Sequence, residues 1–213
     1  MKKPRILLAD DHKIVLEGLK GLLEPEFELV GTVEDGRALV AQAAKLRPDV
    51  IVADISMPRL NGIDAVQQIK KTAPAIKVVF LTMHPDVTYA AGAFEAGASG
   101  FVLKHSASTE LITALREALQ GRTYVTPLIA GDLIRTYQRK GFPTAPSSAE
   151  LSSRQREVLQ LLAEGKSAKE IGALLNISAR TVEFHKYRIM ELLHIKTSAE
   201  LVQYAVKQGL ISV

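Results

Sequence analysis

Five side chains that can bind metal ions and phosphate follow short apolar runs in the first half of this 213-residue chain. They are Asp10 and Asp11 after residues 5–9, Asp54 after residues 50–53, Thr82 after residues 76–81, and Lys104 after residues 100–103. Clustered carboxylates attract a hard divalent cation, and Mg²⁺ prefers a few carboxylates with water and a phosphoryl oxygen. A metal, a hydroxyl and an ammonium also suit the oxygens of a transferring phosphoryl group. If these side chains meet, we expect phosphoryl-transfer chemistry.

Asp54 is the residue that we expect to react. Asp10 and Asp11 are adjacent and suit a pair of metal ligands. Asp54 stands alone after an apolar run and can act as a nucleophile that forms an aspartyl phosphate. Each residue by itself has an ordinary alternative role as a helix cap, a turn former or part of a surface ion pair. Only their combination indicates a site.

The elements that must position these side chains alternate between strand and helix. Strand-like runs cover residues 5–9, 27–33, 50–53, 76–81 and 100–103, and helical patterns cover about 12–23, 36–46, 62–72, 86–96 and 107–120. Such alternation predicts a parallel sheet that is covered by helices on both faces. Ligands of open sheets bind beyond the carboxyl ends of the strands, where the five side chains fall.

Composition and length are those of an ordinary globular protein with room for two domains. The chain has 47% hydrophobic and 23% charged residues. The absence of Cys excludes disulfides and thiolate metal sites, and it is typical of a reducing compartment. No apolar run is long enough for a signal peptide or a membrane span. We therefore expect a cytoplasmic protein without membrane contact.

Charge is unevenly distributed along the chain, whose net charge is +4. Residues 1–121 hold 14 Lys or Arg against 15 Asp or Glu, a balance of −1. Residues 122–150 hold 4 against 2, and residues 151–213 hold 9 against 6. A neutral front and a basic back suggest a polyanionic partner for the back. An ordinary solvated face would give the same balance.

The middle of the chain contains the expected domain boundary. Residues 124–127 resemble a turn into a helix, which continues to about residue 138. A Pro/Gly/Ser-rich run over residues 140–148 is typical of a linker. We therefore assign residues 1–121 to the first domain, 122–147 to a linker helix and flexible linker, and 148–213 to the second domain. Such a linker lets two domains dock and separate, or it is a passive tether.

The back of the chain has clear helix punctuation. Capping-box patterns begin at Ser152, Ser167 and Thr197, and Gly165 ends the first helix. Later helices are predicted at about 168–175, 179–193 and 198–208. Two helices joined by a three-residue turn, inside a basic four-helix domain, fit a helix-turn-helix.

The third of these helices carries side chains that suit DNA. We expect DNA contacts from Lys169, Arg180, Thr181, Glu183, Phe184, Lys186, Tyr187 and Arg188. The cations can neutralise phosphates, the hydroxyl can bond one, and the aromatic rings can meet thymine methyls or sugars. Glu183 could accept a hydrogen bond from cytosine or pair with Lys186. The plain alternative is a helical bundle with a solvated face.

Residues 3–121 resemble the receiver domain of two-component response regulators. The resemblance rests on Asp10-Asp11, Asp54, Met57-Pro58 with Gly62, Thr82, and Phe101 with Lys104. It implies a flavodoxin-like, five-stranded parallel sheet in the order 2-1-3-4-5. It also implies that Asp54 accepts phosphate from a sensor histidine kinase. Mg²⁺ would be held by Asp11, Asp54 and the backbone carbonyl of Ser56, with Asp10 acting partly through water. Thr82 and Phe101 would be the switch pair, and Lys104 would contact the phosphate.

Residues 148–211 are similar to the LuxR/FixJ-type DNA-binding domain. The similarity rests on the stretches that begin at Leu151, Gly165 and Ile177. Together the two resemblances imply a NarL/FixJ-type response regulator, a transcription factor that catalyses only its own phosphorylation and dephosphorylation. Phosphorylation would promote a homodimer and free the helix-turn-helix to bind double-stranded promoter DNA.

Two other functions compete with this interpretation. One is a metal-dependent phosphatase with an Asp nucleophile, but haloacid-dehalogenase-like sites need a second Asp two residues later, where this chain has Ser56. The other is a constitutive DNA-binding protein whose first domain is only structural.

Overall fold

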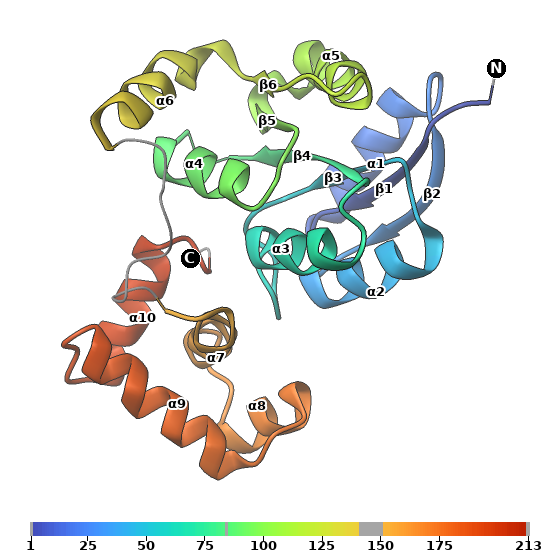
Figure 1. The fold of residues 1–213 in the computed structure, drawn as a ribbon. Coiled ribbons are helices and arrows are strands. Elements are labelled where there is room, and N and C mark those ends of the chain that lie inside the picture. Colours follow the sequence, from blue (N-terminus) through green and yellow to red (C-terminus); the bar gives the residue numbers. More distant parts are fainter. Residues whose placement is uncertain (1, 84, 141–150, 212–213) are drawn as a thin grey trace.

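A computed structural model describes residues 2–83, 85–140 and 151–211 (Figure 1). Its first part is a parallel sheet with the strand order β2-β1-β3-β4-β5-β6. The strands are β1 (Arg5–Ala9), β2 (Glu28–Val33), β3 (Val50–Ala53), β4 (Lys77–Thr82), β5 (Gly100–Leu103) and β6 (Tyr124–Val125). The expected parallel α/β fold is therefore confirmed, and its order 2-1-3-4-5 is extended by one short strand.

The sixth strand lies where the sequence predicts only a turn. The backbone N–H of Tyr124 donates to the carbonyl of Ser99, and the N–H of Thr126 donates to the carbonyl of Phe101. Because β6 has only two residues, it carries no periodicity that could distinguish it from a turn. It removes the free edge that β5 would otherwise present.

Helices cover both faces of the sheet. On one face lie α1 (Lys13–Leu23) and α5 (Ala107–Leu119), and on the other lie α2 (Gly36–Leu46), α3 (Gly62–Thr72) and α4 (Val87–Glu95) (Figure 1). A short 3-10 helix, η1 (Lys104–Ser106), joins β5 to α5. Alternate strand residues point to opposite faces, so Leu8 and Val52 pack under α1 and α5 while Leu7 and Ile51 pack under the other helices.

The linker helix α6 (Pro127–Lys140) lies beside α4 (Figure 1). Ile129 and Leu133 are buried in the core layer that α4 also joins. Most of the expected flexible linker, residues 141–148, lies outside the described residues.

The helical part consists of α7 (Ser153–Ala163), α8 (Ala168–Leu175), α9 (Ala179–Leu192) and α10 (Ser198–Lys207) around its own apolar core. Ser152 and Ser167 form complete capping boxes, as predicted. The third predicted box is incomplete: the Thr197 hydroxyl accepts from the N–H of Glu200, while the Glu200 carboxylate accepts at 2.9 Å from the N–H of Lys196. Nowhere in the described ranges is there a helix whose length and apolarity would let it cross a membrane.

Candidate functional site

The centre of the site is the carboxylate of Asp54, which directly follows the central strand β3. The Lys104 ammonium lies 2.7 Å from Asp54 Oδ2 and 2.7 Å from Asp10 Oδ2. The other Asp54 oxygen, Oδ1, accepts from the backbone N–H of Ile55 at 2.6 Å. All three charged side chains are buried, with exposed fractions of 2%, 6% and 9% for Asp10, Asp54 and Lys104. Groups up to 94 residues apart are therefore brought together at the carboxyl edge of the sheet.

Asp11 completes an acidic cluster beside this ion pair. Ligand atoms of Asp10, Asp11, His12 and Asp54 lie within 4.8 Å of one another. Asp11 Oδ1 is buried without a hydrogen-bond partner, although it lies 3.0 Å from the Nδ1 of His12, because that approach lacks hydrogen-bond alignment. An orphaned carboxylate oxygen aimed into a group of carboxylates is what a hard cation requires. The donor set therefore fits Mg²⁺. His12 was not among the expected ligands.

Burial sets the electrostatics of the pocket. It raises the pKa of Asp54 above its ordinary value, with Lys104 opposing and the Asp10 charge reinforcing the rise. For Lys104, burial acts to lower the pKa, but its pairing with Asp54 and Asp10 outweighs this and the net pKa is raised. Lys104 thus stays cationic, and the negative charge at Asp54 is costly unless a cation compensates it.

The expected switch residues lie on the two strands next to β3. Thr82 is the last residue of β4, is fully buried, and pairs in register with Leu103. Phe101 in β5 is also fully buried and belongs to the core layer under α4. Ser56, whose carbonyl is an expected metal ligand, lies in the loop directly after Asp54 and is 9% exposed. These positions agree with the roles that the resemblance implies, and the roles themselves stay predictions.

The loop between β3 and α3, residues 55–61, has almost no free space on two sides. A Cβ added to Gly62 would lie 2.0 Å from the carbonyl oxygen of Asp54. A Cβ added to Gly36 would lie 1.9 Å from the carbonyl oxygen of Leu60. Arg59 has a φ of +66°, so the loop also contains a left-handed turn. Close backbone contacts therefore define the path of the chain that leaves Asp54.

A third side of this loop is held by residues that the sequence analysis missed. Helix α7 lies next to α3 (Figure 1). Its Gln160 contacts the backbone of Met57 and Asn61. Gln160 carries no sequence signal of this role, because a single Gln within an apolar helical pattern is usually a surface position. It is nevertheless fully buried.

Of the residues predicted to contact DNA, Lys169 lies on α8 and the others lie on α9; Thr181, Glu183 and Lys186 are partly buried, and the rest are exposed. Phe184 and Tyr187 are 61% and 67% exposed, and Arg180 and Lys169 are also exposed. Thr181 and Arg188 already have partners within the helical part. The Thr181 hydroxyl is within 2.8 Å of the Ser178 hydroxyl. Arg188 pairs with Glu191 at 2.6 Å. Lys186 lines a small hollow formed with α7 and α10.

The alternative role for Glu183, an ion pair with Lys186, is absent from the described part of the chain. Glu183 is partly buried, and its contact with a base stays a prediction.

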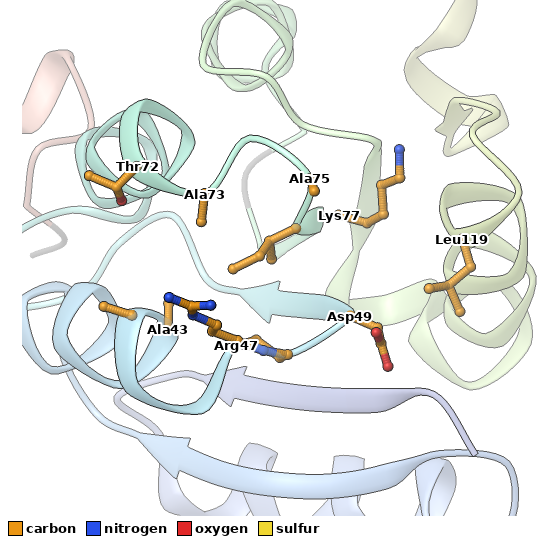
Figure 2. Close-up of a pocket in the computed structure, with 11 residues that line it drawn as sticks. Ala43, Arg47, Asp49, Thr72, Ala73, Ala75, Lys77 and Leu119 are labelled. Atoms are coloured by element: carbon orange, nitrogen blue, oxygen red, sulfur yellow. The ribbon is translucent and has the colours of Figure 1, made fainter. Parts of the chain in front are cut away.

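A separate hollow lies at the amino-terminal ends of the strands, on the side of the sheet away from the acidic site. Figure 2 shows that Ala43, Arg47, Asp49, Thr72 and Lys77 are among the residues around it. Asp49 precedes β3 and Lys77 begins β4, so the hollow lies at the amino ends of strands whose carboxyl ends form the acidic site. The Asp49 carboxylate is engaged by the backbone N–H of Arg5 at 2.7 Å. This hollow is therefore not part of the candidate site.

Comparison with known families agrees with both halves of the structure. Residues 6–116 match the response regulator receiver domain. Residues 149–205 match the bacterial regulatory proteins of the luxR family. The two matches cover the acidic site and the helix-turn-helix respectively.

Similar proteins extend over nearly the whole chain. The transcriptional regulatory protein DegU of Brevibacillus brevis is 35% identical and is matched over 99% of this chain and 96% of its own length. The oxygen regulatory protein NreC of Staphylococcus carnosus is 35% identical and is matched over 97% of this chain and 99% of its own length. Among solved structures, the RcsB response regulator of Salmonella typhimurium has a TM-score of 0.66 at 30% identity, covering 98% of this chain and 99% of that one. RcsB of Salmonella enterica serovar Typhimurium, bound to promoter P1flhDC in the presence of phosphomimetic BeF3−, has a TM-score of 0.62 at 30% identity over the full length of both chains.

Proposed function

Because this chain belongs to the two-component response regulators of the NarL/FixJ type, which act as transcription regulators, we propose that phosphorylation of Asp54 controls its binding to promoter DNA. The observation that carries this proposal is the convergence of Asp10, Asp54 and Lys104 in one buried pocket. The phosphate donor is the phosphohistidine of a sensor kinase. Receiver, linker and helix-turn-helix occupy residues 1–121, 122–147 and 148–213, and the protein works in the cytoplasm.

The reaction at Asp54 is a phosphoryl transfer. A carboxylate oxygen of Asp54 attacks phosphorus, the bond from phosphorus to the histidine nitrogen breaks, and the departing imidazole takes a proton from solvent. Bound Mg²⁺ would supply positive charge to the phosphoryl oxygens and to the surrounding carboxylates. Asp11, Asp54 and the Ser56 carbonyl would hold it, with Asp10 acting partly through water. Lys104 already lies 2.7 Å from the reacting carboxylate and contacts the phosphoryl oxygens after transfer.

The change caused by phosphorylation is then transmitted from the pocket to the receiver surface through two buried residues. The Thr82 hydroxyl bonds the phosphoryl group, and Phe101 occupies the space that Thr82 leaves. Because both residues are fully buried in packed strands, a shift of either must move its neighbours. The remodelled surface favours pairing of two receivers.

DNA is read by α9 in a homodimer. Arg180, Phe184 and Tyr187 lie on an exposed face of this helix, and paired helices would enter half-sites roughly 34–36 Å apart. The docked helical part contacts the receiver through α7 and through Gly209, which lies against Tyr89 of α4, and the exposed α9 residues are left uncovered. Phosphorylation therefore acts by freeing the helical part to take its place in a dimer rather than by uncovering α9.

Intact-protein mass spectrometry after treatment with acetyl phosphate and Mg²⁺ tests the phosphorylation. Wild type should gain one phosphoryl group, and Asp54→Asn should gain none. Phosphorylated wild type should also bind promoter DNA more tightly and elute as a dimer. Thr82→Ala should be phosphorylated without these gains. Equal DNA affinity for wild type and Asp54→Asn under phosphorylating conditions would instead support a constitutive DNA-binding protein.

A further inference from the structure

The backbone of the loop that follows Asp54 is hydrogen-bonded by side chains of the DNA-binding part. Gln160 Nε2 donates to the carbonyl of Met57 at 2.9 Å, and Gln160 Oε1 accepts from the N–H of Asn61 at 2.8 Å. Between them, the N–H of Arg59 donates to Glu164 Oε1 at 2.8 Å. Three backbone groups at alternate positions are thus satisfied by Gln160 of α7 and by Glu164, the residue that directly follows this helix. From these contacts we propose that α7 is a clamp on the phosphoacceptor loop and that Gln160 is its positioning residue.

The clamp is built as one bonded unit. Gln160 is fully buried, and its amide also donates to Glu164 at 2.9 Å, so the two clamping side chains are linked. A buried amide is costly unless its donors and acceptors are engaged. The position of Gln160 therefore depends on the loop, and the positions of Met57 and Asn61 depend on Gln160.

Ion pairs around Gln160 fix the register of α7 on the receiver. Arg156 lies 2.7 Å from the buried Asp64 of α3, and Glu157 lies 3.0 Å from Arg37 of α2. The two pairs have opposite polarity, so each part offers one cation and one anion to the other. This contact is polar and charge-complementary, which suits a surface that must also exist separately in water.

The residues held by the clamp are close in the chain to the phosphorylation site, so movement at one is passed to the other. The carbonyl of Ser56, the expected metal ligand, belongs to the rigid peptide unit that ends at the Cα of Met57. Movement of that carbonyl toward a metal-bound phosphoryl group displaces Met57, whose own carbonyl is the Gln160 acceptor. Gly62 and Gly36 leave the loop little space on its other sides. A change at Asp54 therefore acts directly on the hydrogen bonds between this loop and α7.

Coupling of this kind is reciprocal. This inference rests on the proposed function, in which phosphorylation favours release of the helical part. If the phosphorylated loop weakens the docking of α7, docking must weaken the binding of a phosphoryl group by the same factor. Loss of the clamp should therefore make the pocket easier to phosphorylate. Docking of the DNA-binding part thus opposes phosphorylation of the receiver, just as phosphorylation opposes docking.

Beryllofluoride, an equilibrium mimic of the phosphoryl group, tests the clamp in the full-length protein. It is titrated with Mg²⁺ into wild type, Gln160→Ala, Glu164→Ala and Gln203→Ala, and bound fluoride is followed by ¹⁹F NMR. The first two variants should reach half-saturation at a concentration about 5-fold below that of wild type. Gln203→Ala makes the same truncation as Gln160→Ala at an exposed position of α10 and should match wild type.

A second measurement separates the clamp from a purely structural role of Gln160. Small-angle X-ray scattering in chelator should show a larger radius of gyration for Gln160→Ala and Glu164→Ala than for wild type, while circular dichroism shows unchanged helix content. Equal half-saturation and equal scattering in wild type and both variants would overturn the clamp. Failure of wild type itself to bind beryllofluoride would instead overturn the proposed phosphorylation site, so the two failures are distinguishable.

Discussion

Lys104 Nζ donates to Asp54 Oδ2 at 2.7 Å while it also lies 2.7 Å from Asp10. Replacing it with an apolar residue of similar length, Lys104→Met, would leave two buried carboxylates without their cation. We expect the free energy of unfolding in chelator to fall by about 3 kcal/mol. Excess Mg²⁺ should recover part of this loss. Urea denaturation with and without Mg²⁺ measures both effects, and an unchanged stability in chelator would contradict the ion-pair assignment.

Asp11 has a buried oxygen without a hydrogen-bond partner, so its main contribution should appear when Mg²⁺ is added. At a Mg²⁺ concentration one hundred times its Kd, wild type should gain about 2.7 kcal/mol of stability. Asp11→Asn should gain less than half of this, and in chelator it should be at least as stable as wild type because a like charge beside Asp10 is removed. Thermal unfolding measures the gain. Asp132→Asn, in α6, should behave as wild type in both conditions.

Two glycines in helices should respond in opposite ways to the same substitution. In Gly62→Ala the new Cβ would meet the carbonyl of Asp54 at 2.0 Å, and overpacking of this kind costs about 2–3 kcal/mol. Gly18 lies inside α1 with nothing within 4 Å of a new Cβ, so Gly18→Ala should stabilise the protein by about 0.5–1 kcal/mol. Urea denaturation of both variants checks the signs, and a neutral Gly62→Ala would show that the loop can relax.

Arg180 is the second residue of α9. In helix-turn-helix proteins the amino-terminal residues of the recognition helix contact the DNA. Arg180→Ala should weaken promoter binding and reduce the slope of log affinity against log salt concentration by about one unit. Lys207→Ala also removes one positive charge, but at the end of α10, and should leave the slope unchanged. Fluorescence anisotropy over a series of salt concentrations measures the slope. Equal effects of the two variants would mean that binding depends only on net charge.

The ion pair between Asp64 and Arg156 should orient the docked helical part. Asp64→Arg and Arg156→Asp each place like charges 2.7 Å apart, so each should increase the radius of gyration in small-angle scattering. The double variant restores opposite charges and should return the radius toward the wild-type value. Arg188→Asp, on the exposed face of α9, serves as the control. A double variant as extended as the singles would argue against direct pairing.

The sequence predicts most of the fold and the acidic pocket, because parallel strands bring their carboxyl ends to one edge whatever their separation in the chain. Asp10, Asp54 and Lys104 could therefore be grouped from three short apolar runs. Contacts between separately folded parts leave no such periodic signal. Arg156 and Glu157 read equally well as solvated helix positions, and only the structure shows that both reach the receiver.

Local hydrogen-bond choices were also beyond the sequence. Glu200 has the spacing of a capping box, yet it turns to the N–H of Lys196, which competes for the same carboxylate. The pairing of Tyr124–Val125 with β5 depends on the strand edge that happens to be free beside it.

That two-residue strand is also the place where the linker helix α6 is joined to the sheet. The chain that enters α6 is held against β5 by β6, and the Thr126 hydroxyl accepts from the N–H of Leu103, the residue before Lys104. When the carboxyl-terminal part is bound to a promoter, a pull along α6 should act first on the hydrogen bonds that join β6 and Thr126 to β5. We therefore expect such a pull to displace Leu103 and the neighbouring Lys104 before it strains the other strands of the sheet.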